Sequence, residues 1–190
     1  MSDIRTFLMM GRPGAGKGTQ AKLLAEKIGG QVIDSGARCR EFAAQDTFFG
    51  RKTKQVIESG DLMPEWFSIY LFEDVLIRLE PAQAVVFEGA GRKVLEAQEF
   101  DKAATWLERP YRVVHLSASE AVLKERLLKR AAVEGRADDA AQAINVRFER
   151  FREYTLPALE FFRSRGVLVE INADQPIEAV HSDALKALQL

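Results

Sequence analysis

Residues 6–20 read TFLMMGRPGAGKGTQ, and this stretch decides the fold of the chain. It begins with a short apolar run, Phe7–Met10, bounded by charged residues, as is typical of a buried strand. A glycine-rich turn follows, and after it apolar residues recur at helical spacing over residues 21–28. The sequence therefore predicts a strand, a glycine-rich loop and a helix in immediate succession.

This order of elements favours a loop that binds phosphate groups. Glycines allow backbone conformations that side chains forbid, so several N–H groups can face inward, and the following helix adds its positive end. Lys17 supplies a full charge beside the phosphates and Thr19 a hydroxyl near a metal, although Gly18 separates the two where the general motif has Ser or Thr directly after the lysine. A glycine-rich turn without a ligand is the alternative. The residues predicted to bind a nucleoside triphosphate are Gly14, Ala15, Gly16, Lys17, Gly18 and Thr19.

Further strand-like runs alternate with helical patterns along the chain, at residues 31–34, 84–88, 111–116 and 167–171. Together with the first strand they predict βαβ units, and hence an α/β fold with a parallel five-stranded sheet and helices on both faces. Ligands of such sheets bind at the carboxyl ends of the strands. The first candidate segments are therefore those that directly follow strands, namely 11–19, 35–40, 89–92 and 173–175.

Charged residues follow the second and third strands. Asp34 or Ser35 can cap the next helix, whose first turns carry Arg38 and Arg40. These arginines suit either an anion site or a solvated helix start. Glu88 ends the third strand, where a carboxylate near a phosphate loop can contact Mg²⁺ through water. An exposed strand end is the alternative for Glu88.

Four arginines flank one short linker in the C-terminal half, and planar guanidinium groups fit phosphate oxygens bidentately. A charge-laced surface helix could explain each of them individually. Pro157 is expected to kink or divide the long helix after the linker. The four arginines are Arg126, Arg130, Arg136 and Arg147.

Composition narrows the function classes. The chain has 190 residues, enough for one domain with a sizeable core, and its net charge of -1 gives no reason to expect a nucleic-acid or membrane partner. Cys39 is the single cysteine, which excludes an intrachain disulfide and a cysteine-based zinc site. No secretory signal or bilayer-length apolar segment is present. We expect a cytoplasmic monomer.

Taken in order, these segments resemble the adenylate kinase family of nucleoside monophosphate kinases, which are P-loop NTPases. The likeness covers nearly the whole chain, from residues 11–19, which follow the pattern GxPGxGKGT, to Asp174-Gln175-Pro176. It implies a single domain with a core of residues 1–34, 81–128 and 140–190. It also implies a small helical insertion at about 35–64 that binds the monophosphate, and a short lid at about 130–138.

The resemblance further implies transfer of the γ-phosphoryl group of MgATP to a nucleoside monophosphate, with AMP as the first candidate. The residues implied to act in transfer are Lys17, Arg92, Arg130, Arg136 and Arg147. Those implied to bind ATP are Gly14 to Thr19, Arg126, Arg130 and Gln175. Those implied to bind the monophosphate are Ser35, Gly36, Arg40, Asp61, Leu62, Met63, Gly89, Arg92, Glu96, Arg136 and Arg147. Thr19 and Glu88 would hold Mg²⁺, the latter through water.

The chain departs from the family pattern near the acceptor site. Ala90-Gly91 stands in place of Phe-Pro, Ala37 and Glu88 each replace an aspartate, and Glu96 replaces the glutamine that reads adenine. A carboxylate only accepts hydrogen bonds, so Glu96 weakens the case for AMP in favour of GMP or another acceptor. The alternatives are a kinase for GMP, another monophosphate or a small molecule, and a nucleotide-binding relative with little transferase activity.

Overall fold

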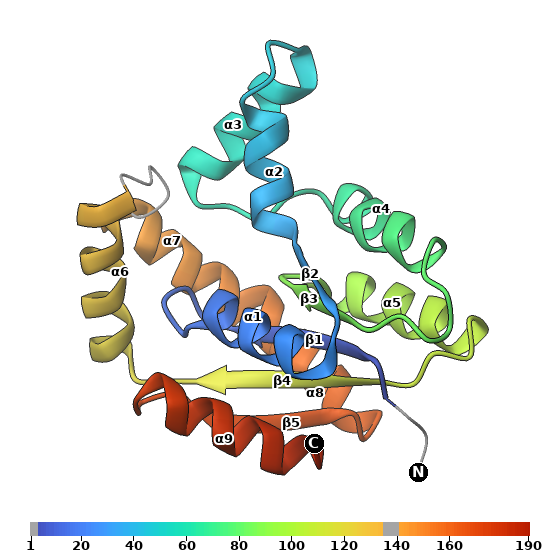
Figure 1. Ribbon diagram of the computed structural model, residues 1–190. Coiled ribbons are helices and arrows are strands. Elements are labelled where there is room, and N and C mark those ends of the chain that lie inside the picture. Colours follow the sequence, from blue (N-terminus) through green and yellow to red (C-terminus); the bar gives the residue numbers. More distant parts are fainter. Residues whose placement is uncertain (1–3, 135–140) are drawn as a thin grey trace.

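A computed structural model of the chain describes residues 4–134 and 141–190 (Figure 1). The described residues form one sheet of five parallel strands in the order β2-β3-β1-β4-β5, which confirms the fold predicted from the sequence. In the register, Leu8 of the central strand lies between Phe87 and Val113. The strands are β1 (Thr6–Gly11), β2 (Gln31–Asp34), β3 (Val85–Glu88), β4 (Tyr111–Ser117) and β5 (Leu168–Asn172).

Helices connect the strands, and in Figure 1 α2 and α3 stand well away from the sheet. Pro157 lies in the first turn of α8, directly after a turn of π-helix, so the long helix is divided there as predicted. The helical elements are α1 (Lys17–Ile28), α2 (Ser35–Ala43), α3 (Phe48–Ser59), α4 (Glu65–Leu76), α5 (Val94–Trp106), α6 (Glu120–Glu134), α7 (Ala141–Arg150), the π-helix η2 (Phe151–Thr155), α8 (Leu156–Ser164) and α9 (Ile177–Leu188).

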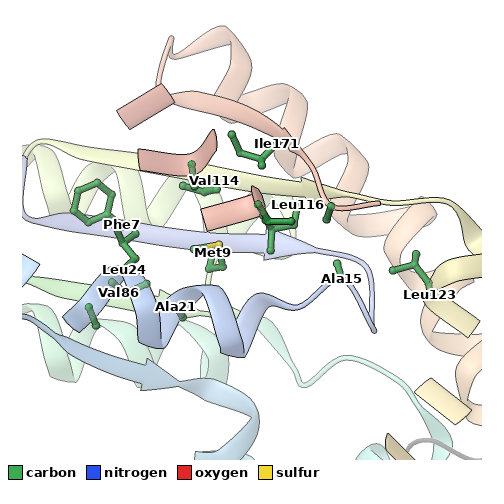
Figure 2. Packing of buried hydrophobic residues seen from close by; sticks show 14 of the residues in the cluster. Phe7, Met9, Ala15, Ala21, Leu24, Val86, Val114, Leu116, Leu123 and Ile171 are labelled. Carbon is green, nitrogen blue, oxygen red and sulfur yellow. The ribbon is translucent and has the colours of Figure 1, made fainter. Parts of the chain in front are cut away.

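Strand β1 is buried on both faces because its side chains alternate between two cores. Phe7 and Met9 belong to a core built with α1, α6, α7 and α9, part of which Figure 2 shows. Leu8 and Met10 belong to a second core, built with α4, α5 and α8. A parallel sheet covered on both faces requires such continuous apolar runs in its strands. The carboxyl end of β1, where the glycine-rich loop begins, is thereby fixed from both sides.

In the part of the chain that the structure describes, no helix combines the length and the apolar character that crossing a bilayer requires.

Truncation of Phe87 in β3 should weaken the fold. Its side chain is fully buried and its ring meets the ring of Phe100 edge-on, with 5.5 Å between centroids. We expect Phe87→Ala to lower the free energy of unfolding by about 3–5 kcal/mol in urea denaturation, through lost burial and a residual cavity. Trp106→Ala is the matched control, because that ring is 83% exposed. A small loss for Phe87→Ala, similar to that of the control, would contradict the packing described above.

Candidate active site

Two neighbouring pockets open at the carboxyl edge of the sheet. One, which we call the loop pocket, is lined by the glycine-rich loop, the start of α1 and the segment between β5 and α9. The other, which we call the β3 pocket, is lined by the end of β3, helices α2 and α3 and residues of α6 and α7. The residues that line both pockets are Gly14, Lys17, Asp34, Arg40, Glu88 and Arg130.

The glycine-rich loop takes a backbone path that its glycines make possible. Gly14 and Gly16 have φ angles of +83° and +86°, in the left-handed region that favours glycine. A Cβ atom on Gly14 would lie 2.8 Å from the carbonyl oxygen of Leu123, whereas one on Gly16 would meet nothing within 4 Å. Gly16 is the N-cap of α1 and has no side chain to occupy the helix N-terminus. The loop is therefore packed against α6 on one side and open in front of α1, where an anion can be bound.

Lys17 lies at the junction of the two pockets. Its Nζ donates a hydrogen bond to the carbonyl oxygen of Arg12 over 3.0 Å. Burial, followed by the positive charges of Arg92, Arg147 and Arg130, lowers the pKa of Lys17 to about 7, although the Glu88 carboxylate acts in the opposite direction. Protonation of Lys17 is therefore costly while the site holds no ligand. A bound polyanion would restore the charged form, so the position suits a polyanion-binding lysine.

Arginines from four separate elements line the β3 pocket: Arg40 from α2, Arg92 from the loop after β3, Arg130 from α6 and Arg147 from α7. Arg40 also forms a 3.4 Å ion pair with Asp34, which caps α2 by accepting from the Ala37 N–H. The structure thus brings together four of the arginines predicted for the site. Arg136 lies outside the described residues.

Glu88 lies beside the glycine that follows the lysine. A Cβ atom on Gly18 would lie 3.0 Å from Oε2 of Glu88, the end of a side chain that can shift to make room. Thr19 lines the loop pocket near by. A carboxylate and a hydroxyl are oxygen donors of the kind that Mg²⁺ takes in small number, its remaining ligands being water and phosphate. These two residues therefore fit the metal that the sequence predicts.

The other predicted residues divide between the pockets as the sequence analysis expects, with exceptions. Ser35 lines neither pocket. Glu96 is only 2% exposed, and its Oε2 accepts a 2.8 Å hydrogen bond from the Arg92 backbone N–H; the expected contact of Glu96 with the acceptor's base is not supported by this placement. The remaining residues line the loop pocket at Ala15, Gly16, Gly18, Thr19, Arg126 and Gln175, and the β3 pocket at Gly36, Asp61, Leu62, Met63 and Gly89.

Gln175 is held by its own neighbours. Its Nε2 donates to the carbonyl oxygen of Asn172 and to Oδ2 of Asp183, at 2.8 and 2.9 Å. The backbone carbonyl oxygen of Gln175 accepts a long hydrogen bond of 3.5 Å from the Arg126 guanidinium. The wall of the loop pocket between β5 and α9 is consequently fixed before any ligand binds.

Several residues of this region were not predicted from the sequence, among them Phe151, Thr155 and Arg12. Phe151 and Thr155, at the two ends of the π-helix, line the β3 pocket. Arg12 forms a 3.0 Å ion pair with Glu120, and its guanidinium lies 5.5 Å from the centroid of the Phe151 ring. The proline two residues after Thr155 is a signal for the π-helical turn. No comparable pattern marks Arg12, whose partner is 108 residues away.

Comparisons with known proteins find relatives over most of the chain. A family model described as Adenylate kinase matches residues 9–167. A protein of Thermus thermophilus named Adenylate kinase is 35% identical over 169 residues, which cover 88% of each chain. One of Leptospira biflexa with the same name is 32% identical over 97% of this chain and 100% of that protein. Human Adenylate kinase isoenzyme 1 is 27% identical over 98% of each chain.

The lowered pKa of Lys17 can be tested directly. The ¹³Cε resonance of Lys17 in the ligand-free protein should titrate with a midpoint of about 7. Inorganic triphosphate should raise that midpoint, because a nearby anion favours the ammonium form. Lys17→Arg should remove the titration, since guanidinium stays charged over this range. A midpoint at the ordinary value of 10.5 would contradict the burial and repulsion described here.

Proposed function

Because the chain belongs to the adenylate kinase family, we propose that its two pockets bind MgATP and a nucleoside monophosphate end to end and that the γ-phosphoryl group passes between them. The family makes the chain an ATP-dependent phosphotransferase with nucleoside monophosphate kinase activity. The choice of donor, acceptor and residue roles below is our proposal.

One observation carries this proposal: the loop pocket and the β3 pocket share a wall that contains Lys17, Glu88 and Arg130. Residues assigned to the donor line one side of the wall, and residues assigned to the acceptor line the other. Two polyanions bound there would meet at the shared wall, where cations can neutralise both. Both pockets are built from one chain, in keeping with a monomeric enzyme.

The proposed catalysis consists of positioning and charge neutralisation. Phosphoryl transfer needs little covalent chemistry from the protein, and no covalent intermediate or general base is required. Lys17, Arg92, Arg130 and Arg147 would offset the charge on the oxygens of the moving group. Arg136 is proposed to act with these residues because the family resemblance implies it. Mg²⁺, held by Thr19 and by Glu88 through water, would neutralise charge on the donor phosphates when bound.

The segments on either side of the β3 pocket are proposed to bind and cover the acceptor. Cys39 and Arg40 of α2 and Ile57 of α3 line the pocket from the 35–64 segment, and Arg130 of α6 and Arg147 of α7 line it from the rest of the chain. A short lid at about 130–138 would then exclude water, which would otherwise compete as the acceptor. Residues 135–138 of that lid lie outside the described residues.

AMP is the proposed acceptor. The relatives are named adenylate kinases, and adenylate is the acceptor that this name specifies. The objection that Glu96 would oppose adenine loses its force, because the Glu96 carboxylate is buried against the Arg92 amide and lines neither pocket.

ADP release from MgATP should therefore be fastest with AMP when AMP, GMP, CMP, UMP and their deoxy forms are compared. A higher kcat/KM with GMP would overturn AMP as the acceptor, and nucleotide binding without turnover on any of these monophosphates would overturn the proposal as a whole.

Removal of the Lys17 charge should abolish most of the transfer without unfolding the protein. We expect Lys17→Met to lower kcat/KM by about 10²-fold or more, as loss of a preorganised charge stabiliser does. The methionine side chain keeps the bulk, and no charge has to be buried, so the urea midpoint should not fall. Lys27→Met, at an exposed position near the end of α1, is the matched control. Near-normal turnover of Lys17→Met would refute its assigned role.

A further inference from the structure

The loop that carries Arg92 depends on glycine conformations. Gly89 and Gly91 have φ angles of +88° and +70°. Proline fixes φ near −65°, so the proline of the family pattern could not occupy position 91 in this conformation. A Cβ atom on Gly91 would in addition lie 3.0 Å from the Phe162 ring. The loop therefore lacks the stiffening that a Phe-Pro pair gives, and some other contact has to hold Arg92.

Glu96 provides such a contact. It lies in the first turn of α5 and is only 2% exposed. Its Oε2 accepts a hydrogen bond of 2.8 Å from the Arg92 backbone N–H. Burial raises the pKa of the Glu96 carboxyl, whereas this hydrogen bond and the nearby Ser68 hydroxyl of α4 act in the opposite direction. A carboxylate removed from water in this way is costly unless its oxygens are satisfied. Glu96 thus links the Arg92 loop to two helices.

The Arg92 side chain passes close to the backbone of Gly89. Its guanidinium lies so close to Gly89 that a Cβ atom there would clash with it. The same side chain lines the β3 pocket. The neighbouring residue, Lys93, forms a 3.3 Å ion pair with Glu65 at the start of α4. Displacement of the Arg92 backbone would consequently move the guanidinium within the pocket.

We propose that Glu96 is a positioning residue, which fixes the Arg92 backbone so that the guanidinium meets the phosphate of the acceptor, and that it does not read the acceptor's base. This inference rests on the proposed function of the β3 pocket. Recognition of the base then falls to residues that line the pocket, among them Ile57, Leu62 and Met63.

If Glu96 acts in this way, its removal should lower kcat/KM by a factor that does not depend on the base of the acceptor. Glu96→Ala should lower kcat/KM about 10- to 100-fold, because removal of one partner of a buried hydrogen bond leaves the Arg92 N–H unsatisfied, and by the same factor for AMP, GMP and CMP. Glu96→Asp, which keeps the charge but is one methylene shorter, should lose activity in the same way. Glu96→Gln should keep activity within about threefold, because its amide oxygen can accept from Arg92 and its NH₂ can donate to Ser68.

Two controls separate positioning from general damage. Glu99→Ala removes a carboxylate one turn further along α5, where it pairs with Lys102, and should leave activity unchanged. In a double-mutant cycle, Glu96→Ala should add little to the loss already caused by Arg92→Ala, because the two residues act as one unit. A change in the ratio of AMP to GMP activity in Glu96→Gln, or full additivity in the cycle, would overturn the proposal.

Amide hydrogen exchange gives a readout that is independent of turnover. In the ligand-free protein, the Arg92 N–H should be protected in the wild type and in Glu96→Gln, and should lose at least about tenfold in protection in Glu96→Ala and Glu96→Asp. Unchanged protection in all four proteins would refute the anchoring role even if the chain is an active kinase. If the wild type showed no turnover on any monophosphate, the proposed function would fail while this measurement still decided whether Glu96 anchors Arg92.

Discussion

Repulsion among cations at one edge of the sheet is the constraint on which the rest of the structure depends. Lys17 is surrounded by Arg92, Arg130 and Arg147, with Glu88 as an opposing carboxylate. In water such charges would separate, and each would keep its hydration. Burial together with these neighbouring cations lowers the pKa of Lys17 to about 7, so the ligand-free site is stabilised by losing a proton or by gaining an anion.

The fold can hold these charges together because each comes from a different element with its own packing. Lys17 follows β1, whose side chains are buried in both cores, and Arg147 lies beside Phe148, which is buried in the first core. The backbone positions from which these charged side chains extend are thus fixed by the two cores, where burial of one large apolar side chain contributes about 1.5–3 kcal/mol. The packing of these elements thus offsets the electrostatic cost of the site, and a bound polyphosphate would neutralise its positive charges.

Patterns of neighbouring residues predicted several elements correctly, whereas contacts between residues far apart in the sequence could not be predicted. The strand before Gly11, the loop and the Asp34 cap follow from neighbouring residues, and all three form as expected. The placement of Glu96 could not be predicted, because it depends on φ at Gly91 and on Ser68 of another helix. The Arg12–Glu120 ion pair joins residues far apart in sequence and has no local pattern. Periodicity identifies which residues are buried, but not which partner each one meets.

The departures from the family pattern are linked in the structure, although the sequence shows them as separate replacements. Glycine at position 91 adopts a φ that proline cannot, and Ala90 is buried in the second core without a large ring. Both changes remove rigidity next to Arg92, and Glu96 adds a buried hydrogen bond to that residue. Glu88 replaces a shorter aspartate and lies beside Gly18, whereas Glu96 is no longer than the glutamine that it replaces. At position 96 it is therefore the burial of the carboxylate and its hydrogen bond to the Arg92 amide, not a gain in length, that offsets the lost rigidity.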